Sequence, residues 1–503
     1  MKNKFGNVFI FFAIAWFVGC TTRTGELLMQ GAPETKLFLT KINLPDSLRL
    51  AGQIKLYWYG EAKNGYIKSY DFAFDNQPCG NTAIGALNWV NTPKSDSSFL
   101  LPLPTRVEKA DITFYVRAID NMNQTDPTPA CLVVPVINTA PTLSLTKTSK
   151  SKSGALQAVT DSVHSIFSIE WTADDAEGAQ YVDSIYIKIN NSDWTVFPAN
   201  INQLIFMPDV PEAVGTTSCS LLANVEARAL QTKIQGLNVK ANNKIYVKSR
   251  DINATFSKID STNTFFVKQK VSDLLVIDSY KSNLASEKAV LSIVGLAYAS
   301  GYNYYNFNTD NDAYVPKYWG TVFYQTLKQY KKVIWFNEKN FSVSSGTTDD
   351  EKATSIEVAA DAIQKYLNGG GRMFIASVLP ANGSTVYSFA PFTGISTATG
   401  TARINKDSTA YPVDASFLQL NEVLTCTGII TGATPGYVKE TAKPLLKVKT
   451  TSLNGWSGPN DICAYTIDSQ GKANLIFFST NIYNFTLGPL QKLFDVVLND
   501  KFK

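Results

Sequence analysis

Lys331-Lys-Val-Ile-Trp-Phe-Asn337 is a short apolar run, and two similar runs flank it, Ser272-Asp-Leu-Leu-Val-Ile-Asp278 before it and Gly371-Arg-Met-Phe-Ile-Ala-Ser377 after it. Between the second and third runs along the chain, residues 349–368 place apolar side chains at helical spacing. A strand, a helix and a strand in this order favour a parallel sheet with helices on its faces. The sequence therefore predicts a three-layer α/β parallel-sheet domain over residues 270–503.

Further helices and strands are expected within this domain. Residues 284–297 and 319–330 have apolar faces of helical period, and residues 303–307 and 473–479 have the pattern of strands. Thr347 or Thr348 is expected to cap the helix 349–368. A last helix carries four apolar residues on one face, namely Leu490, Phe494, Val497 and Leu498. Residues 379–459 are rich in Thr, Ser, Gly and Ala, which indicates an insertion that forms a lid or a β-rich excursion over the strand ends.

The candidate site follows from this architecture. Ligands of parallel α/β sheets bind beyond the carboxyl ends of the strands, and the residues there are Asp278, Asn337, Glu338 and Ser377. They are the candidate ligand-binding residues. Two alternatives stay open. Asp278 and Glu338 could act as the paired carboxylates of a glycoside hydrolase. An aromatic-rich run could instead form a sugar-stacking platform, made of Tyr302, Tyr304, Tyr305, Phe307, Tyr314, Tyr318 and Trp319.

The stretch Tyr366-Leu-Asn-Gly-Gly-Gly-Arg-Met-Phe-Ile-Ala-Ser377, together with residues 332–336 and 476–479, resembles the class I glutamine amidotransferase-like superfamily, and its trehalose-utilisation-like branch in particular. In enzymes of that superfamily the corresponding strand leads into a tight elbow carrying a cysteine, and a histidine follows later. Here Ala376-Ser-Val-Leu-Pro380 lacks the small residues of an elbow, and no histidine follows. The resemblance therefore implies this fold without its catalytic residues, and the protein is expected not to be an enzyme.

The N-terminus has the pattern of an export signal, because Lys2 and Lys4 precede the apolar residues 5–18. It ends in Phe17-Val-Gly-Cys20, which resembles the lipobox of bacterial lipoproteins. The resemblance implies removal of residues 1–19 and lipid modification of Cys20, whose acyl chains, such as palmitate, would hold the protein on the outer membrane. Many surface lipoproteins of the Bacteroidota carry acidic residues directly after the cysteine. Thr21-Thr-Arg-Thr24 differs from that pattern, so the periplasmic or cell-surface face stays open.

Residues 20–32 are expected to form a tether, and residues 33–138 a first domain of short alternating strands. Two of these strands are Ile54-Lys-Leu-Tyr-Trp-Tyr59 and Ile112-Thr-Phe-Tyr-Val-Arg-Ala-Ile119, and the pattern is typical of a β-sandwich. The later strand, with the turn Asp126-Pro-Thr-Pro129, resembles the penultimate strand of fibronectin type III and related immunoglobulin-like modules. The resemblance places Tyr115 at the tyrosine-corner position.

The same pattern repeats over residues 139–269. Ile166-Phe-Ser-Ile-Glu-Trp171 parallels the Trp58 strand, and Ile245-Tyr-Val-Lys-Ser-Arg-Asp251 parallels the Tyr115 strand. A second immunoglobulin or fibronectin III-like sandwich is therefore expected. Its acidic turn contains Asp174, Asp175 and Glu177. These carboxylates match no defined calcium loop, so a solvated turn is expected there.

The remaining cysteines indicate disulfides, which form in an oxidising compartment. Pairing Cys79 with Cys131, or Cys426 with Cys463, closes a loop within one predicted domain. Cys219 has no such partner. No Cys-x-x-Cys spacing occurs, and His164 is the one histidine, so no metal site and no cofactor are expected. His164 is expected to be structural or exposed.

The amino-acid composition restricts the classes of function that this protein can have. Hydrophobic residues make up 45% and charged residues 17%, which suits packed domains, and the formal charge of +4 gives no indication of nucleic-acid binding. We expect a non-catalytic lipoprotein, lipid-anchored in the outer membrane, that acts as a binding or assembly component of a cell-envelope complex. Its partner would be an envelope protein or a glycan. The alternative is a surface carbohydrate-active enzyme or other hydrolase that uses Asp278 and Glu338.

Overall fold

The computed structural model describes residues 31–38, 53–101, 109–151, 153, 155–176, 178–280, 284–306, 319–337, 342–344, 352–380, 383–394, 402–418, 423–452 and 456–503. It has two compact units. One contains Met1–Pro141 with the segments Asp174–Val182 and Asp251–Thr255, and the other contains Thr142–Ala173, Asp183–Arg250 and Phe256–Lys503. The predicted leader and Cys20 lie outside the described residues. None of the helices among the described residues has the length and apolar character needed to cross a membrane.

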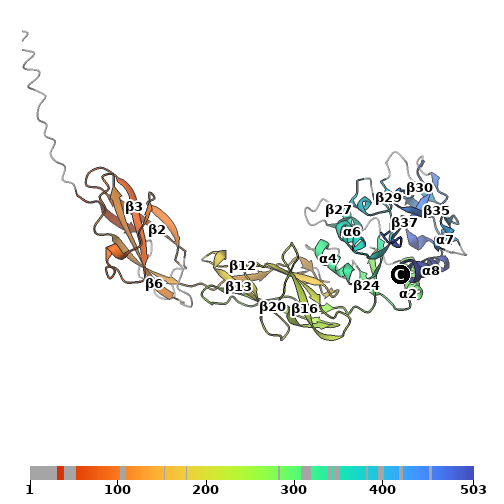
Figure 1. The fold of residues 1–503 in the computed structure, drawn as a ribbon, viewed down its shortest axis with the longest axis horizontal. Coiled ribbons are helices and arrows are strands. Elements are labelled where there is room, and N and C mark those ends of the chain that lie inside the picture. The colour runs from red at the N-terminus through yellow and green to blue at the C-terminus, as the bar shows by residue number, and fades with distance from the viewer. Residues whose placement is uncertain are drawn as a thin grey trace, which may run out of the picture. The chain divides into compact units, whose positions relative to one another are not determined.

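The first unit contains a β-sandwich (Figure 1). One sheet has the order β1-β2-β5, and the other has the order β4-β3-β6-β7. In chain order, the first, second and fifth strands face the third, fourth, sixth and seventh, as in sandwiches of the immunoglobulin and fibronectin III type. The core holds Trp58, Phe114 and their neighbours. The strands are β1 (Glu34–Phe38), β2 (Gln53–Glu61), β3 (Ile67–Asp75), β4 (Val90–Thr92), β5 (Asp96–Leu100), β6 (Lys109–Asp120) and β7 (Ala130–Ile137).

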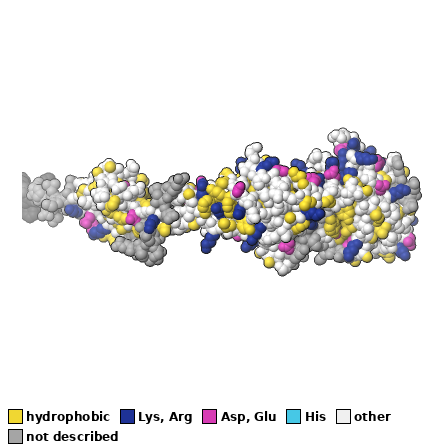
Figure 2. Space-filling view, turned by 90° about the horizontal axis from the view of Figure 1, so that it is seen from below, with side chains coloured by type: hydrophobic (Ala, Val, Ile, Leu, Met, Phe, Trp, Pro, Cys, Tyr) yellow, Lys and Arg dark blue, Asp and Glu magenta, His cyan; other side chains and the backbone are white. Residues whose placement is uncertain are grey.

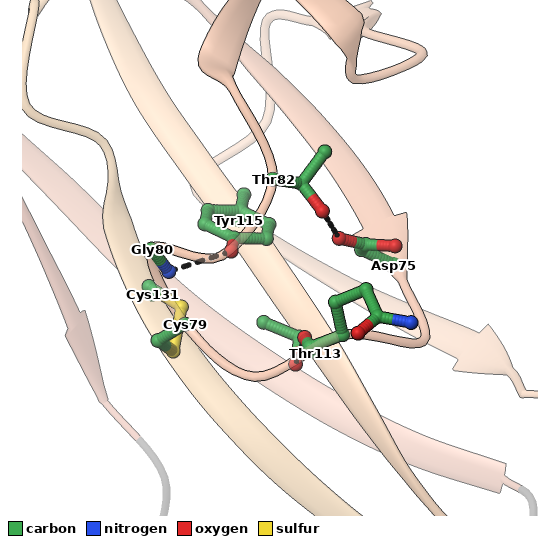
Figure 3. The surroundings of a disulfide bond; sticks show 8 residues. Asp75, Cys79, Gly80, Thr82, Thr113, Tyr115 and Cys131 are labelled. Atoms are coloured by element: carbon green, nitrogen blue, oxygen red, sulfur yellow. Dashed lines mark hydrogen bonds between the residues drawn. A yellow bond between two sulfur atoms is a disulfide. The ribbon is translucent and has the colours of Figure 1, made fainter.

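A loop after β3 covers the outer face of the second sheet (Figure 3). Cys79 of this loop forms a disulfide with Cys131 of β7, which is one of the two predicted pairings. The Tyr115 hydroxyl accepts a hydrogen bond from the Gly80 amide at 3.0 Å. The prediction of a tyrosine corner is therefore wrong. Phe114 and Val116 of β6 point into the core, so alternation turns Tyr115 to the opposite face, where its ring packs beneath the loop.

The second sandwich repeats this arrangement with an insertion. β8 (Thr142–Leu145), β12 (Phe167–Asp174) and β15 (Gln203–Pro208) lie in one sheet, which β16 (Gly215–Ala223), β17 (Arg228–Ala229) and β18 (Ile234–Val239) extend. The facing sheet has the order β14-β13-β20-β21. Its strands are β13 (Val182–Ile189), β14 (Thr195–Pro198), β20 (Ile245–Asp251) and β21 (Asp260–Ser261). Shorter strands are β9 (Ser149–Lys150), β10 (Leu156–Gln157), β11 (Ser162–Val163), β19 (Ala241–Asn243) and β22 (Phe265–Val267).

The C-terminal part is built on a nine-stranded sheet with the order β24-β23-β25-β28-β38-β37-β35-β31-β32. The first five strands pair in parallel and the rest pair antiparallel, so the sheet is mixed. The parallel strands are β23 (Leu274–Ser279), β24 (Asn303–Asn306), β25 (Lys332–Asn337), β28 (Arg372–Ser377) and β38 (Ala473–Phe478). The antiparallel ones are β31 (Thr409–Pro412), β32 (Leu424–Thr425), β35 (Lys443–Val448) and β37 (Asp461–Ile467).

Helices cover both faces of this sheet. α2 (Ala285–Ala297) and α8 (Leu487–Val496) pack on one face, and the π-helical turn η7 (Val497–Lys501) continues α8. α4 (Trp319–Lys328) and α6 (Ala360–Asn368) pack on the other. All six residues of β23 are buried because apolar side chains meet helices on either side.

The helix predicted over residues 349–368 begins later than expected. β26 (Ser342–Ser344) pairs with β27 (Lys352–Thr354), and α5 (Ser355–Val358) then leads into α6. Thr354 begins the helix, since its amide and hydroxyl donate to the Glu357 carboxylate at 2.7 and 2.9 Å. Thr347 and Thr348, the predicted caps, lie outside the described residues.

The insertion after β28 contributes β31, β32 and β35 to the antiparallel half of the sheet. Its other elements are η4 (Thr385–Ser388), β29 (Phe392–Thr393), β30 (Ala402–Ile404), α7 (Ala415–Leu418), β33 (Ile430–Ala433), β34 (Tyr437–Val438) and β36 (Thr451–Ser452).

The predicted pairing of Cys426 with Cys463 is wrong, and both thiols are free and buried. Cys463 lies within β37, whereas Cys426 directly follows β32. β35 and β31 lie between these two strands in the sheet. Three strand spacings amount to about 14 Å, and a disulfide needs Cα atoms within about 7 Å.

Candidate functional site

The candidate residues lie at the carboxyl edge of the parallel strands, around the switch point of the sheet. In chain order the parallel strands run 2-1-3-4-5, so the order reverses between β23 and β25. Asn337 and Ser377 are the last residues of β25 and β28, and Asp278 is the last but one of β23. Glu338 lies outside the described residues, as do residues 307–318 after β24.

Strand register divides the candidate residues between the two faces of the sheet. Ser279, Asn337 and Ser377 are partners in neighbouring strands and lie in one row. Asp278 comes one residue earlier than Ser279, and successive side chains of a strand point to opposite faces. Val276 and Tyr280 pack with α2 and α8, so Asp278 points to that side. The structure therefore brings Asn337 and Ser377 together and separates Asp278 from them.

A buried cluster of hydrogen-bonded hydroxyl and amide groups surrounds Asn337. Its Nδ2 donates to Ser377 Oγ at 2.9 Å, and its Oδ1 accepts from Ser355 Oγ at 2.6 Å. Ser355 Oγ also lies 3.0 Å from Ser279 Oγ, which accepts from the Trp335 indole at 2.8 Å. Asn337 and the three serines are each 2% exposed or less. The cluster joins the ends of three strands to the first turn of α5 and has no ionisable member.

Asp278 has its own partners on the other face. Tyr304 donates its hydroxyl proton to Asp278 Oδ2, and the Tyr280 amide donates to Oδ1 at 2.9 Å. Asn306 Nδ2 lies 3.3 Å from Oδ2. Burial raises the pKa of Asp278 above its ordinary value of 3.8, against the lowering effect of these hydrogen bonds. Burial and the neighbouring Asp278 also raise the pKa of the Tyr304 phenol. The phenol therefore keeps its proton and remains a donor.

Segments of the insertion reach the strand ends. The Leu379 amide donates to Thr434 Oγ1 at 2.9 Å, and the Thr434 hydroxyl donates to the Ser479 carbonyl at 3.1 Å. Ser384 donates to the Glu357 carboxylate at 2.6 Å, next to the start of α5. Thr434 therefore ties the segment after β28 to the end of β38.

Cys426, Cys463 and Ser377 have no activating base among the described residues. Burial raises the pKa of the Cys463 and Cys426 thiols, so both stay protonated near neutral pH. The Ser377 hydroxyl donates to the Val378 carbonyl at 3.2 Å and accepts from Asn337. His164 is buried in the second sandwich, where its ring stacks on Tyr305 of β24.

The aromatic run after residue 301 does not form the expected exposed platform within the described residues. Tyr305 is buried against α4, and Tyr302 and Tyr304 pack on the opposite core. Phe307, Tyr314 and Tyr318 lie outside the described residues.

A cavity of about 590 Å³ opens at the opposite, amino edge of the parallel strands. Three of its five basic residues have polar partners: Lys331 pairs with Asp273 at 2.8 Å, and Arg372 pairs with Asp468 at 2.6 Å. Lys332 Nζ donates to the Leu498 carbonyl at 2.6 Å. Because α2, α4 and α6 end at this edge, basic residues here also complement the negative ends of helix dipoles.

Sequence reasoning missed Ser279 and Ser355, and it assigned Tyr304 to the aromatic platform and not to Asp278. Ser279 follows Asp278 directly, and strand alternation already implies that one of the two must face each side of the sheet. The role of Ser355 depends on where α5 begins, which the apolar pattern alone does not set.

Two solved structures to which this chain is similar show low sequence identity. Neither a protein-family model nor a curated protein matches this chain. Among solved structures, fibronectin(III)-like modules of Clostridium thermocellum CbhA are 15% identical and cover 47% of this chain and 95% of that chain, with a TM-score of 0.18. The chicken interferon gamma receptor alpha chain is 10% identical and covers 48% of this chain and 99% of that chain, with a TM-score of 0.19.

Proposed function

We propose that this protein is a non-catalytic lipoprotein of the outer membrane that binds another component of the cell envelope. The observation that carries the proposal is the state of the candidate site. Asn337 and Ser377 are buried and bonded to each other, and Asn337 also binds Ser355. Among the described residues, none of these groups has a neighbouring base. We therefore assign the polar groups at these strand ends a structural role, and we expect ligands to bind on the protein surface.

We also infer that residues 270–503 form a three-layer α/β domain of the class I amidotransferase-like type. The 2-1-3-4-5 order of the parallel strands and the helices on both faces support this inference. The segment after β28, where such an enzyme has its nucleophile, contains Val378 and Leu379, which are buried. The chain has no histidine after His164. The inferred domain is therefore a recognition module without the catalytic pair.

The insertion offers a surface for a protein partner. Large apolar side chains are exposed along it, each between 42% and 53% accessible: Tyr411, Val413, Val423, Ile429 and Tyr437. Exposed apolar side chains also occur on both sandwiches, for example Tyr66 and Val214. The proposal assigns those of the insertion to a protein partner, because exposed apolar patches are typical of surfaces that contact other proteins. A lipid on Cys20 would hold the protein on the outer membrane.

Affinity purification of the tagged full chain from its own envelope, in mild detergent, tests this proposal. We expect one envelope protein to co-purify in stoichiometric amount, and to be lost when Tyr411→Ser and Ile429→Ser are combined. Lys492→Met, an exposed change on α8, is the matched control and should retain the partner. Cys20→Ser should release the protein from the membrane fraction. If the wild-type chain emerges alone, the assembly role is wrong.

The hydrolase alternative has one observation in its favour, the raised pKa of the buried Asp278 carboxyl. A general acid needs such a pKa. Hydrolysis of envelope or plant glycans by the purified chain, lost in both Asp278→Asn and Glu338→Gln, would establish that alternative. We expect no glycan to be cleaved by the wild-type protein.

A further inference from the structure

The outer face of the sheet β14-β13-β20-β21 carries basic and aromatic side chains in alternation. Ile185, Ile187, Ile245 and Val247 are buried, so the residues between them turn outward. Trp194, just before β14, and Phe256, after β20, extend the same surface. We name it the basic-aromatic face, and its members are Tyr186, Lys188, Trp194, Lys244, Tyr246, Lys248, Arg250 and Phe256. In Figure 2, hydrophobic and basic side chains gather over the second sandwich.

Lys248 lies at the centre of this face, among three rings. Its Nζ is 3.8 Å from the centroid of Phe256, 4.8 Å from that of Trp194 and 5.4 Å from that of Tyr186. Lys188 Nζ lies 5.1 Å from Trp194 and 5.3 Å from Tyr246. The rings therefore hold the ammonium groups in place and separate them from one another.

The basic-aromatic face has more positive than negative charge. Arg250 pairs with Asp183, the acidic residue that faces it. No carboxylate among the described residues lies within ion-pair distance of Lys188, Lys244 or Lys248. Burial, and then repulsion by Lys188, lower the pKa of Lys248. An anion bound on this face would stabilise the Lys248 ammonium group and so offset the lowering of its pKa by burial and by Lys188.

Packing alone does not account for this arrangement. Aromatic rings and lysine stems cover the outside of many sheets, but other basic residues of the same unit have acidic partners. Lys233 pairs with Asp209, and Lys270 pairs with Glu212, each at 2.9 Å. Lysines without an ion pair also occur elsewhere in this unit, but here Lys188 and Lys248 both lie over the Trp194 ring with no carboxylate beside them. This grouping of positive charges indicates a negatively charged ligand.

The spacing of the charges indicates a polymer. Lys244 and Lys248 are four residues apart on one extended segment, about 13 Å at 3.3 Å per residue. This backbone spacing suits a chain with repeated charges, which can contact successive lysines along the strand. Trp194 and Tyr246 are half-buried among the lysines, and such rings can stack on the apolar faces of sugar rings. Lysine ammonium groups form charge-assisted hydrogen bonds with carboxylates.

We propose that the basic-aromatic face binds an acidic polysaccharide, whose carboxylate or sulfate groups contact Lys188, Lys244 and Lys248 and whose sugar rings lie on Trp194 and Tyr246. The choice of a glycan over a nucleic acid rests on the export that the proposed function includes. The site itself belongs to another domain than the α/β sheet. Its failure would leave the envelope-partner purification unaffected.

Binding of the detergent-solubilised full chain to polygalacturonate, alginate and chondroitin sulfate tests the proposal. Fully methyl-esterified polygalacturonate is the uncharged control ligand. We expect at least one acidic polymer to bind at least tenfold more tightly than the ester. Lys188→Met with Lys248→Met should weaken that binding at least tenfold while keeping the apolar stems in place, and Trp194→Ala should weaken it about as much. Lys492→Met, on α8, should leave it unchanged.

Three results would overturn the proposal. The first is that none of the three acidic polymers binds. The second is that the ester binds as tightly as the acid. The third is that single-stranded DNA and polyphosphate bind as tightly as the glycans and Trp194→Ala has no effect, which would make the face a general polyanion surface. Thermal unfolding of each variant, compared with wild type, separates loss of the site from loss of the fold.

Discussion

The ring of His164, in the second sandwich, stacks on the ring of Tyr305 in β24, with their centroids 4.3 Å apart and their planes inclined by 20°. His164 is 4% exposed and Tyr305 is 9% exposed. Nearby, Ser165 donates a hydrogen bond to Gln329, which follows α4. The second sandwich and the α/β sheet therefore share buried contacts, and they belong to the same compact unit.

Removing either ring should destabilise this unit, and the two effects should not add. Aromatic pairs contribute about 0.5–1.5 kcal/mol beyond the area they bury. We expect a double-mutant cycle of His164→Ala and Tyr305→Ala, followed by urea unfolding, to give a coupling free energy in that range. The cycle of His164→Ala with Tyr411→Ala, an exposed residue of β31, is the control and should be additive within about 0.5 kcal/mol. Additivity in both cycles would contradict the stacking.

The disulfide of the first sandwich should contribute much of that domain's stability. Cys79 and Cys131 are 52 residues apart, and closing a loop of this size is worth about 2–4 kcal/mol through the entropy of the unfolded chain. The variant Cys79→Ala with Cys131→Ala should lower the free energy of unfolding by this amount. It should also lose the sensitivity of the wild-type domain to reductant.

Alkylation under denaturing but non-reducing conditions checks the same pairing. Cys219, Cys426 and Cys463 should be modified, whereas Cys79 and Cys131 should not. Modification of all five, or protection of Cys426 and Cys463, would contradict the assignment.

The parallel strands of the C-terminal sheet could be predicted because their composition matches their environment. β23, β25 and β28 are covered by helices on both faces, so continuous apolar runs mark them in the sequence. The antiparallel half was not predicted strand by strand, because β31 and β32 are short and because both, like β35, lie in a segment of mixed composition. Cys426 and Cys463 share a hydrophobic core but not a strand pair, and only the sheet order shows that.

The position of the candidate site could be predicted from the sequence, but the contacts between its side chains could not. The carboxyl ends of the strands follow from their order in the chain, and Asp278, Asn337 and Ser377 do lie there. The face of the sheet that each side chain occupies depends on strand register, because a shift of one residue moves a side chain to the other face. The observed register places Ser279, and not Asp278, beside Asn337. The hydrogen bonds that join Asn337 to its neighbours depend on side-chain positions, which cannot be predicted from the pattern of apolar residues.

The cluster around Asn337 should be needed for stability. Asn337→Ala removes the donor to Ser377 and the acceptor for Ser355 in a buried site, and an unsatisfied buried polar group costs about 1–3 kcal/mol. We expect the free energy of unfolding to fall by about that amount in a urea titration. Asn191→Ala, at an exposed position of the second sandwich, should change it by less than about 0.5 kcal/mol. An equal effect of both substitutions would show that the cluster does not contribute.

Asp278 should make stability depend on pH in a direction set by its burial. Burial raises the pKa of Asp278 above 3.8 in the folded protein, so the folded state binds the proton more tightly than the unfolded chain. Stability from this group is therefore greatest in acid and is lost as the pH rises from about 4 through the folded pKa. Asp278→Asn keeps an acceptor for Tyr304 and Tyr280 but cannot ionise.

The difference in the free energy of unfolding between wild type and Asp278→Asn isolates this effect from the other carboxyl groups. Urea titrations at pH 4, 5, 6 and 7 should show wild type losing stability relative to the variant as the pH rises. The size of this loss in free energy gives the difference between the Asp278 pKa values of the folded and unfolded states, since one pKa unit corresponds to about 1.4 kcal/mol. If wild type instead gains relative to the variant, the hydrogen bonds from Tyr304 and Tyr280 stabilise the carboxylate more than burial destabilises it. Asp278 would then be ionised at neutral pH and unsuited to act as a general acid.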